Sequence, residues 1–225
     1  MTAALEELRR EVDRFRAWAD THPVEERSGE WEVHYNGWEE LNEAFIAFVS
    51  SASCADWDAE TTETVHYTIA RDNEMEWLIE HLAQNPGNLL CLAERALGSD
   101  MWEAKWQIAM ALGGLESRRT EAESLLLRFA HDGDEYVRRR ALLALSDLNS
   151  SHVQDLVGPA WDTGEEYQRI AVLCALHQVG SPLLKKYANL AEADGREYLA
   201  KYATYIREHG TLSGFTLQGI PVVDG

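Results

Sequence analysis

The sequence predicts an all-α protein of stacked helix pairs, on the basis of a 31-residue repeat and of helical spacing of apolar residues almost everywhere else. Gly133, Gly164 and Gly195 are 31 residues apart, and each is followed at the same distance by a Glu-Tyr pair. Apolar positions on both sides of these glycines keep the same register. A fixed period of this size marks stacked units, none of which can bury its apolar face alone. We therefore expect a right-handed α-solenoid of antiparallel helix pairs.

The helices of the first third are predicted from apolar stripes and capping residues. Residues 3–20 form an amphipathic helix, and residues 21–35 lack a clear period and read as a loop. Asn36 with Glu39 resembles a capping box that opens a second helix, which fades near residue 51. Asp58 begins a third helix, and Asn73 with Glu76 opens a fourth, which residues 85–87 end. Residues 1–84 are thus expected to be an acidic helical region that packs on the repeats as a cap.

From residue 88 onward the predicted helices come in pairs joined by short turns. Residues 85–210 form the repeat domain, in which Pro159 is expected to kink its helix or to end it early. The pairs are 88–97 with 100–113, 119–131 with 134–148, 151–161 with 165–179, and 182–192 with 196–209. Residues 211–225 contain three glycines and one proline after Gly210, so the tail is expected to be non-helical, either an extended strand on the last repeat or a loose end.

Residues 125–148 resemble a HEAT-like repeat. An acidic turn with Asp132 and Asp134 precedes a helix that begins with Val137-Arg138 and continues with spaced alanines and leucines. Arg169 takes the place of Arg138 in the next unit, and Ala200 replaces it in the last. The resemblance covers about residues 88–210. It implies a curved solenoid whose second helices line a concave face that holds a partner.

Some HEAT-like proteins are enzymes with recognisable sequence signatures. One member, an iron-dependent hydroxylase, uses paired His-Glu dipeptides, and none occurs here. DNA glycosylases of this class use a basic groove, which the charge distribution argues against. No phosphate-binding loop, nucleophile elbow or metal-ligand spacing is present. We therefore expect no metal, no cofactor and no catalytic residue.

The charge of the chain is unevenly distributed. The formal net charge is -19, and residues 20–80 hold 16 Asp and Glu against only Arg27 and Arg71, a net of -14. Such a field attracts cationic partners and repels nucleic acids and anionic membranes. Acidic residues also serve solubility, and those in the repeat turns are expected to cap helices rather than to bind a divalent cation. The local concentration nevertheless favours a binding surface.

Cysteine usage and hydropathy predict the compartment. Cys54, Cys91 and Cys174 are odd in number and far apart, so no disulfide framework is expected and a reducing environment is favoured. Cys91 and Cys174 fall on apolar helix faces as small hydrophobic residues. The first twenty residues contain no apolar run of the kind found in signal peptides, and no stretch approaches the ~20 apolar residues that span a bilayer. A cytoplasmic protein is therefore predicted.

Two candidate surfaces emerge from these patterns. Trp31 and Trp57 lie in loop-like stretches among acids, where they serve either as interface anchors or as local packing. The predicted partner-binding residues are Glu30, Trp31, Glu32, Glu39, Glu40, Glu43, Asp56, Trp57 and Asp58. The predicted residues of the concave groove are Trp102, Trp106, Arg138, Arg139 and Arg140, with Arg138 paired to an acid in a neighbouring turn.

The sequence thus favours a non-catalytic protein whose acidic surface captures a basic protein. An immunity protein or inhibitor that neutralises a cationic toxin is the specific version of this hypothesis. The alternatives are an enzyme or lyase with a site in the concave groove, and a scaffold subunit of a larger assembly.

Overall fold

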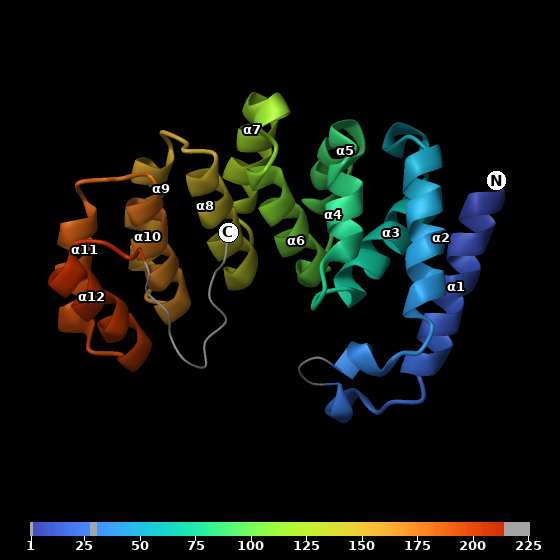
Figure 1. The fold of residues 1–225 in the computed structure, drawn as a ribbon, viewed down its shortest axis with the longest axis horizontal. Helices are drawn as coiled ribbons and strands as arrows, with labels where there is room; N and C mark the ends of the chain where they lie inside the picture. Colours follow the sequence, from blue (N-terminus) through green and yellow to red (C-terminus); the bar gives the residue numbers. More distant parts are fainter. Residues whose placement is uncertain (1, 28–30, 214–225) are drawn as a thin grey trace. The chain divides into compact units, whose positions relative to one another are not determined.

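The computed structural model describes residues 2–27 and 31–213, and Figure 1 shows its helices in sequence colours. The described residues form twelve α-helices and four short 3-10 helices, with no strand. The predicted all-α fold is confirmed. Contacts between Cα atoms divide the chain into two compact units, residues 1–118 and 119–225. The predicted boundaries at residues 84 and 210 remain predictions.

The first unit contains six α-helices: α1 (Ala3–Ala19), α2 (Trp38–Ser51), α3 (Ala59–Arg71), α4 (Trp77–Ala83), α5 (Pro86–Ala96) and α6 (Trp102–Gly113). Its 3-10 helices are η1 (Val24–Glu26), η2 (Trp31–His34), η3 (Cys54–Asp56) and η4 (Glu116–Arg118). Helix α1 packs on α2, α3 packs on α6, and α4 contacts α2, α5 and α6. The apolar stripe of α1 is buried at Leu8, Val12 and Phe15, as its amphipathic pattern predicts.

Two predicted helix starts in this unit are wrong. Helix α2 begins after Gly37, whose position gives no side-chain capping bond, so the expected capping box at Asn36 does not form. Residues 73–75 form a turn instead of the first turn of a helix, and α4 begins only at Trp77. The cap comes from further back in the chain, because the backbone N–H of Leu78 donates a 2.8 Å hydrogen bond to Oδ2 of Asp72.

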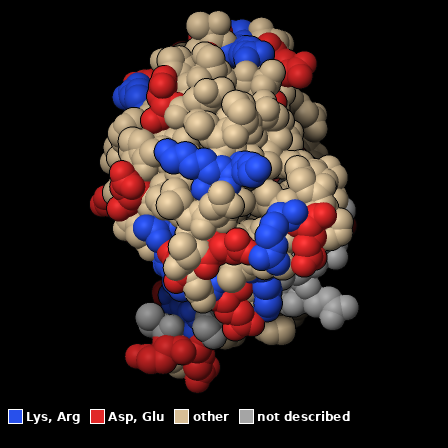
Figure 2. Space-filling model, turned by 90° about the vertical axis from the view of Figure 1, so that its left-hand side faces the viewer, with Lys and Arg blue, Asp and Glu red and all other residues tan. Residues whose placement is uncertain are grey.

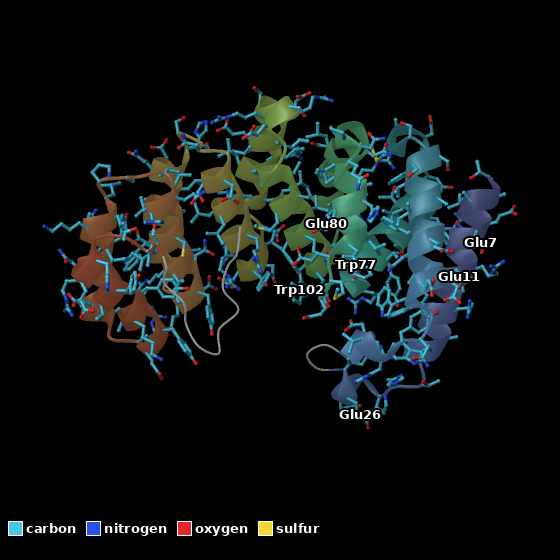
Figure 3. The ribbon with its side chains drawn as sticks, in the orientation of Figure 1. Glu7, Glu11, Glu26, Trp77, Glu80 and Trp102 are labelled. Carbon is cyan, nitrogen blue, oxygen red and sulfur yellow. A yellow bond between two sulfur atoms is a disulfide. The ribbon has the colours of Figure 1, made fainter. Side chains whose placement is uncertain are left out.

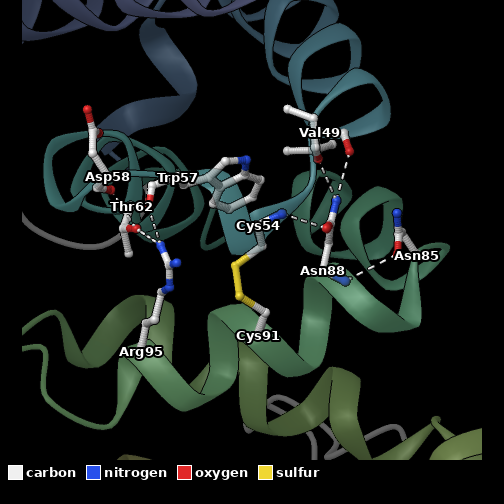
Figure 4. Close-up of a disulfide and its surroundings, with 10 residues drawn as sticks. Val49, Cys54, Trp57, Asp58, Thr62, Asn85, Asn88, Cys91 and Arg95 are labelled. Carbon is white, nitrogen blue, oxygen red and sulfur yellow. Dashed lines mark hydrogen bonds between the residues drawn. A yellow bond between two sulfur atoms is a disulfide. The ribbon is translucent and has the colours of Figure 1, made fainter.

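A disulfide between Cys54 and Cys91 joins η3 to α5, which overturns the expectation of unpaired cysteines (Figure 4). Their Cα atoms lie 6.0 Å apart, within the usual range for this bond. Asn88, one turn before Cys91 on α5, accepts a 2.8 Å hydrogen bond from the backbone N–H of Cys54. It also donates to the carbonyls of Val49 and Ala52, each at 3.0 Å. Sequence spacing could not reveal the pair, because 37 residues separate the two cysteines.

The second unit contains three helix pairs: α7 (Arg119–Phe129) with α8 (Glu135–Asp147), α9 (Val153–Asp162) with α10 (Glu166–Gln178), and α11 (Leu184–Asp194) with α12 (Glu197–His209). Within this unit α10 packs against both α8 and α12, so the second helices of the pairs form one layer. Each first helix packs on the second helix of its own pair, α7 on α8, α9 on α10 and α11 on α12. This is the arrangement that the 31-residue register predicts.

The repeat glycines have different local roles. Gly164 and Gly195 lie between helices with φ of 79° and 78°, a left-handed conformation that favours glycine. Gly133 also lies between helices, but it does not share that conformation. Pro159 does not end its helix early, since α9 continues to Asp162. The predicted tail is described only as far as Ser213, and residues 214–225 lie outside the described residues.

Candidate protein-interaction surfaces

The predicted acidic residues of the first unit are mostly exposed, although they do not form one cluster. Glu39, Glu40 and Glu43 lie exposed near the start of α2. Asp56 and Asp58 are exposed at η3 and at the start of α3, beside a cavity that Phe48 and Ala52 line from the other end of α2. At 1.5 Å per residue, the two ends of this 14-residue helix are about 20 Å apart. Glu30 lies outside the described residues.

Both predicted aromatic anchors take part in local packing, but only Trp57 is buried in the core. Trp57 is only 6% exposed and packs against Phe48, with ring centroids 5.3 Å apart. Trp31 is half-buried and stacks on Trp18 at 5.3 Å, with the Arg27 guanidinium 5.2 Å from its ring centroid. Trp57 is therefore a core residue, whereas Trp31 combines local packing with partial exposure, and its role as an interface anchor remains a prediction.

Glu32 is also buried, and it belongs to an ion-pair network. Its Oε1 lies 3.2 Å from Nη1 of Arg71, while Nη2 of the same arginine lies 2.9 Å from Oε1 of Glu103. Burial raises the pKa of Glu32, and Arg71 partly offsets this effect. The residue after Arg71, Asp72, is buried too, and desolvation raises its pKa to about 6. Glu32 is thus a structural carboxylate rather than a surface contact.

Four exposed apolar residues are close in sequence to the members of this network, and only Trp102 is among the predicted site residues. Val33, Met75, Trp77 and Trp102 are each 40–51% exposed. Trp102 was expected in a concave groove, but its helix packs on α4, which begins with Trp77. Figure 3 places Trp77, Glu80 and Trp102 in one region of the first unit. The signal that could have revealed this region is the apolar Met75 within the otherwise polar segment 71–76, where the sequence predicts a helix start at Asn73.

The other groove residues are placed within their own units. Trp106 is 5% exposed on α6 and is a core residue of the first unit. In the second unit, the guanidinium carbons of Arg139 and Arg140 lie 4.3 and 5.0 Å from the ring centroid of Tyr136. Arg139 also lies 5.1 Å from the ring centroid of Tyr167. The groove as a whole remains a prediction.

Arg138 forms the ladder that the sequence predicts. Its Nη2 donates a 2.7 Å hydrogen bond to Oε2 of Glu165 in the next turn, and its Nη1 donates to two backbone carbonyls of its own turn. Arg169, one repeat later, pairs with Asp194 in the same way. Hydrogen bonds from Arg196 and Arg169 lower the pKa of Asp194 to about 2. These acids therefore connect successive repeats.

Among the other acids of the repeat turns, Asp134 and Glu166 accept hydrogen bonds from backbone N–H groups at helix starts, whereas Glu135 and Glu197 pair with Arg139 and Lys201 of their own helices. Oδ1 of Asp134 accepts a 2.8 Å hydrogen bond from the backbone N–H of Tyr136, and Oε1 of Glu166 accepts one of 3.2 Å from Leu199. In the described part of the chain, no three His, Cys, Asp or Glu side chains are grouped as metal ligands would be. Figure 2 shows positive and negative side chains intermixed on the end that carries α11 and α12.

Comparison with known proteins agrees with this repeat geometry. Residues 91–177 match the family model for HEAT repeats. This segment belongs to the HEAT repeat family. HEAT repeats typically mediate protein binding. A search of the curated proteins finds no significant match to the chain. Within the described residues, no helix is both long enough and apolar enough to cross a membrane.

Proposed function

We propose that the protein binds a basic protein partner through the acidic surface of its first unit. The observation that carries the proposal is the charge of residues 1–118, which hold 24 Asp and Glu against nine Lys and Arg, a net of -15. Residues 119–225 hold 15 against 11, a net of -4. Concentrated charge of one sign speeds the encounter with an oppositely charged protein and selects against partners of like charge.

Glu39, Glu40 and Glu43 are the best-placed acids for this role. All three are exposed on one short stretch of α2, and none has an ion pair among those resolved within the described residues. Asp58, in contrast, caps α3 by accepting a hydrogen bond from the N–H of Thr61. Because the carboxylates of Glu39, Glu40 and Glu43 are not engaged in ion pairs within the described residues, they can attract a basic partner without the loss of an existing contact.

A salt series and a charge-reversal variant test the proposal. Tagged protein is used to isolate partners from the native host, and binding of the purified partner is then measured. We expect a basic partner, an association rate that falls steeply as salt rises, and slower association for the triple variant Glu39→Lys, Glu40→Lys, Glu43→Lys. A matched triple variant in the second unit (Asp155→Lys, Asp162→Lys, Glu208→Lys) should bind as the wild type does. An acidic partner, or equal rates for both variants, would contradict the proposal.

The specific version of the proposal is an immunity protein or inhibitor that neutralises a cationic toxin. Co-expression with the isolated partner tests it, since neutralisation restores the growth of cells that the partner alone arrests. The cytoplasmic location likewise remains a proposal. The Cys54–Cys91 disulfide argues against it, because disulfides are rare in reducing compartments. Alkylation of free thiols in intact cells of the native host decides the point.

A further inference from the structure

The first unit carries an exposed apolar patch, formed by Val33, Met75, Trp77 and Trp102. These are four of the six large hydrophobic residues with high exposure in the described part of the chain. Their exposed fractions are 47%, 51%, 50% and 40% respectively. Trp77 and Trp102 are the most exposed tryptophans, whereas Trp57, Trp106 and Trp161 are at most 7% exposed. Aromatic residues in such positions mark interaction sites more often than isolated aliphatic residues do.

Ion pairs and hydrogen bonds of Arg71 and Asp72 join the segments that carry the patch residues, which come from distant parts of the sequence. Arg71 forms ion pairs with Glu32, which precedes Val33, and with Glu103, which follows Trp102. Asp72 accepts a hydrogen bond from the backbone N–H of Leu78, the residue after Trp77. Met75 lies in the turn that joins Asp72 to Trp77. Every patch residue is therefore next to, or between, residues that are fixed by these bonds.

The backbone at Trp77 is held in an unusual conformation. Glu76, which precedes it, has a φ of 55°, and left-handed residues other than Gly and Asn are uncommon. Such conformations persist only when the surrounding structure fixes them, and they cluster at functional sites. The bond from Leu78 to Asp72 supplies that constraint here. The turn thus presents Trp77 at the start of α4 with half of its side chain exposed.

The charge around the patch is negative. Glu74 and Glu80 are exposed on either side of Trp77, and Asp100 is exposed two residues before Trp102. The nearest cation in the network, Arg71, is already paired with two carboxylates. Trp rings attract Lys and Arg through their π-faces, and this attraction adds to that of the surrounding acids. The chemistry therefore complements a segment that combines cationic and apolar side chains.

We propose that this patch docks an amphipathic segment of a protein partner, with Lys or Arg side chains beside apolar ones. Trp77 and Trp102 contact the apolar side chains and the cations, while Glu80 pairs with a remaining cation. The inference rests on the proposed function for the basic character of the partner, but it assigns the anchoring to residues other than the acids of α2.

Labelled peptides test the docking by fluorescence anisotropy with the full-length chain. One peptide is a 14-residue amphipathic helix of Leu and Lys, and a second keeps the lysines but replaces every Leu by Ser. We expect the first to bind, the second to bind at least tenfold more weakly, and Trp77→Ala with Trp102→Ala to remove that difference. The matched control (Tyr167→Ala with Leu190→Ala) changes the other two exposed hydrophobic residues, and it should bind the first peptide as the wild type does.

A phenylalanine variant and the charge-reversal variant of α2 separate this inference from folding effects and from the proposed function. Trp77→Phe with Trp102→Phe should restore most of the binding, and a melting temperature of the alanine variant equal to that of the wild type would exclude a folding defect. If both peptides bind equally and only the α2 variant weakens them, the patch proposal fails while the acidic-surface proposal stands. If neither peptide binds, the patch proposal also fails, and the native partner alone decides the acidic-surface proposal. A wild type that dimerises through these tryptophans would likewise overturn it, since the occupant would be a second copy.

Discussion

Arg71 lies between Glu32 and Glu103, with nitrogen-to-oxygen distances of 3.2 and 2.9 Å, and so ties η2 and α6 to the end of α3. The side chain of Glu32 is only 5% exposed, whereas that of Glu103 is 22% exposed. The two carboxylates therefore depend on the arginine to different degrees. Removing it leaves one carboxylate buried without its counter-charge, and such groups are costly.

We expect Arg71→Met to lower the free energy of unfolding by about 2–4 kcal/mol, because it leaves the Glu32 carboxylate buried without a counter-charge. Adding Glu32→Gln should recover much of this loss. Arg207→Met is the control, since Arg207 pairs with Glu192 on the surface, and such pairs contribute about 0–1 kcal/mol. Urea denaturation measures all three variants. Equal effects of the two arginine substitutions would show that burial of Glu32 is not what matters.

The fold was largely predictable from the sequence, because the helical spacing of apolar residues does not depend on the details of tertiary packing. The register of Gly133, Gly164 and Gly195 sufficed for the helix pairs, and the position of Arg138 sufficed for the ladder to Glu165. The candidate site was not predictable to the same extent. Whether Trp57 or Trp77 is exposed depends on which helices cover it, and that is a tertiary property without a local signature.

The same reason explains the errors at residues 73–76 and at the cysteines. A polar run followed by apolar residues fits a capped helix start, but Asp72 supplies the cap from before the turn and displaces the start to Trp77. Cys54 and Cys91 meet only because η3 packs on α5. Neither contact is encoded by spacing along the chain.

Breaking the disulfide should destabilise the protein substantially. The bond closes a loop across 37 residues, and a crosslink of that span contributes about 2–4 kcal/mol, chiefly by restricting the unfolded chain. Cys54→Ser with Cys91→Ser should lower the melting temperature, and dithiothreitol should lower that of the wild type to a similar value. Cys174, the third cysteine, serves as the internal control for thiol reactivity. Burial raises the pKa of its thiol to about 12, and this slows its reaction with alkylating reagents. A melting temperature that dithiothreitol does not change would argue against a stabilising disulfide.

Two buried groups should give opposite dependences of stability on pH. Burial lowers the pKa of His66 to about 4, so the unfolded chain takes up the proton first and stability falls as pH decreases from 6.5 towards 4. Burial raises the pKa of Asp72 to about 6, so the folded chain keeps a proton that the unfolded chain loses above 3.8. Stability from this group therefore falls as pH increases from 3.8 towards 6. Each effect amounts to about 3 kcal/mol at its limit.

Variants at each position separate these contributions. Relative to the wild type, Asp72→Asn should gain stability as pH rises from 4 to 6, and His66→Asn should gain it as pH falls from 6.5 to 4. The neighbours Arg95 and Lys105 near His66, and Glu76 and Glu80 near Asp72, shift the midpoints without changing these signs. Urea denaturation across the pH range measures the differences. Parallel curves for wild type and variants would show that neither group titrates differently on folding.

The left-handed conformation of Glu76 predicts that glycine is more stabilising than alanine at this position, the reverse of their order within a helix. Both Glu76→Gly and Glu76→Ala delete the carboxylate, but only alanine retains the cost of a φ of 55°, about 1–2 kcal/mol. The glycine variant should therefore be the more stable by about 1 kcal/mol. At Glu80, which lies within α4, the order should reverse, because glycine in a helix is less favourable than alanine by about 0.5–1 kcal/mol. If alanine is the more stable at both positions, the turn that presents Trp77 is not held in this conformation in solution.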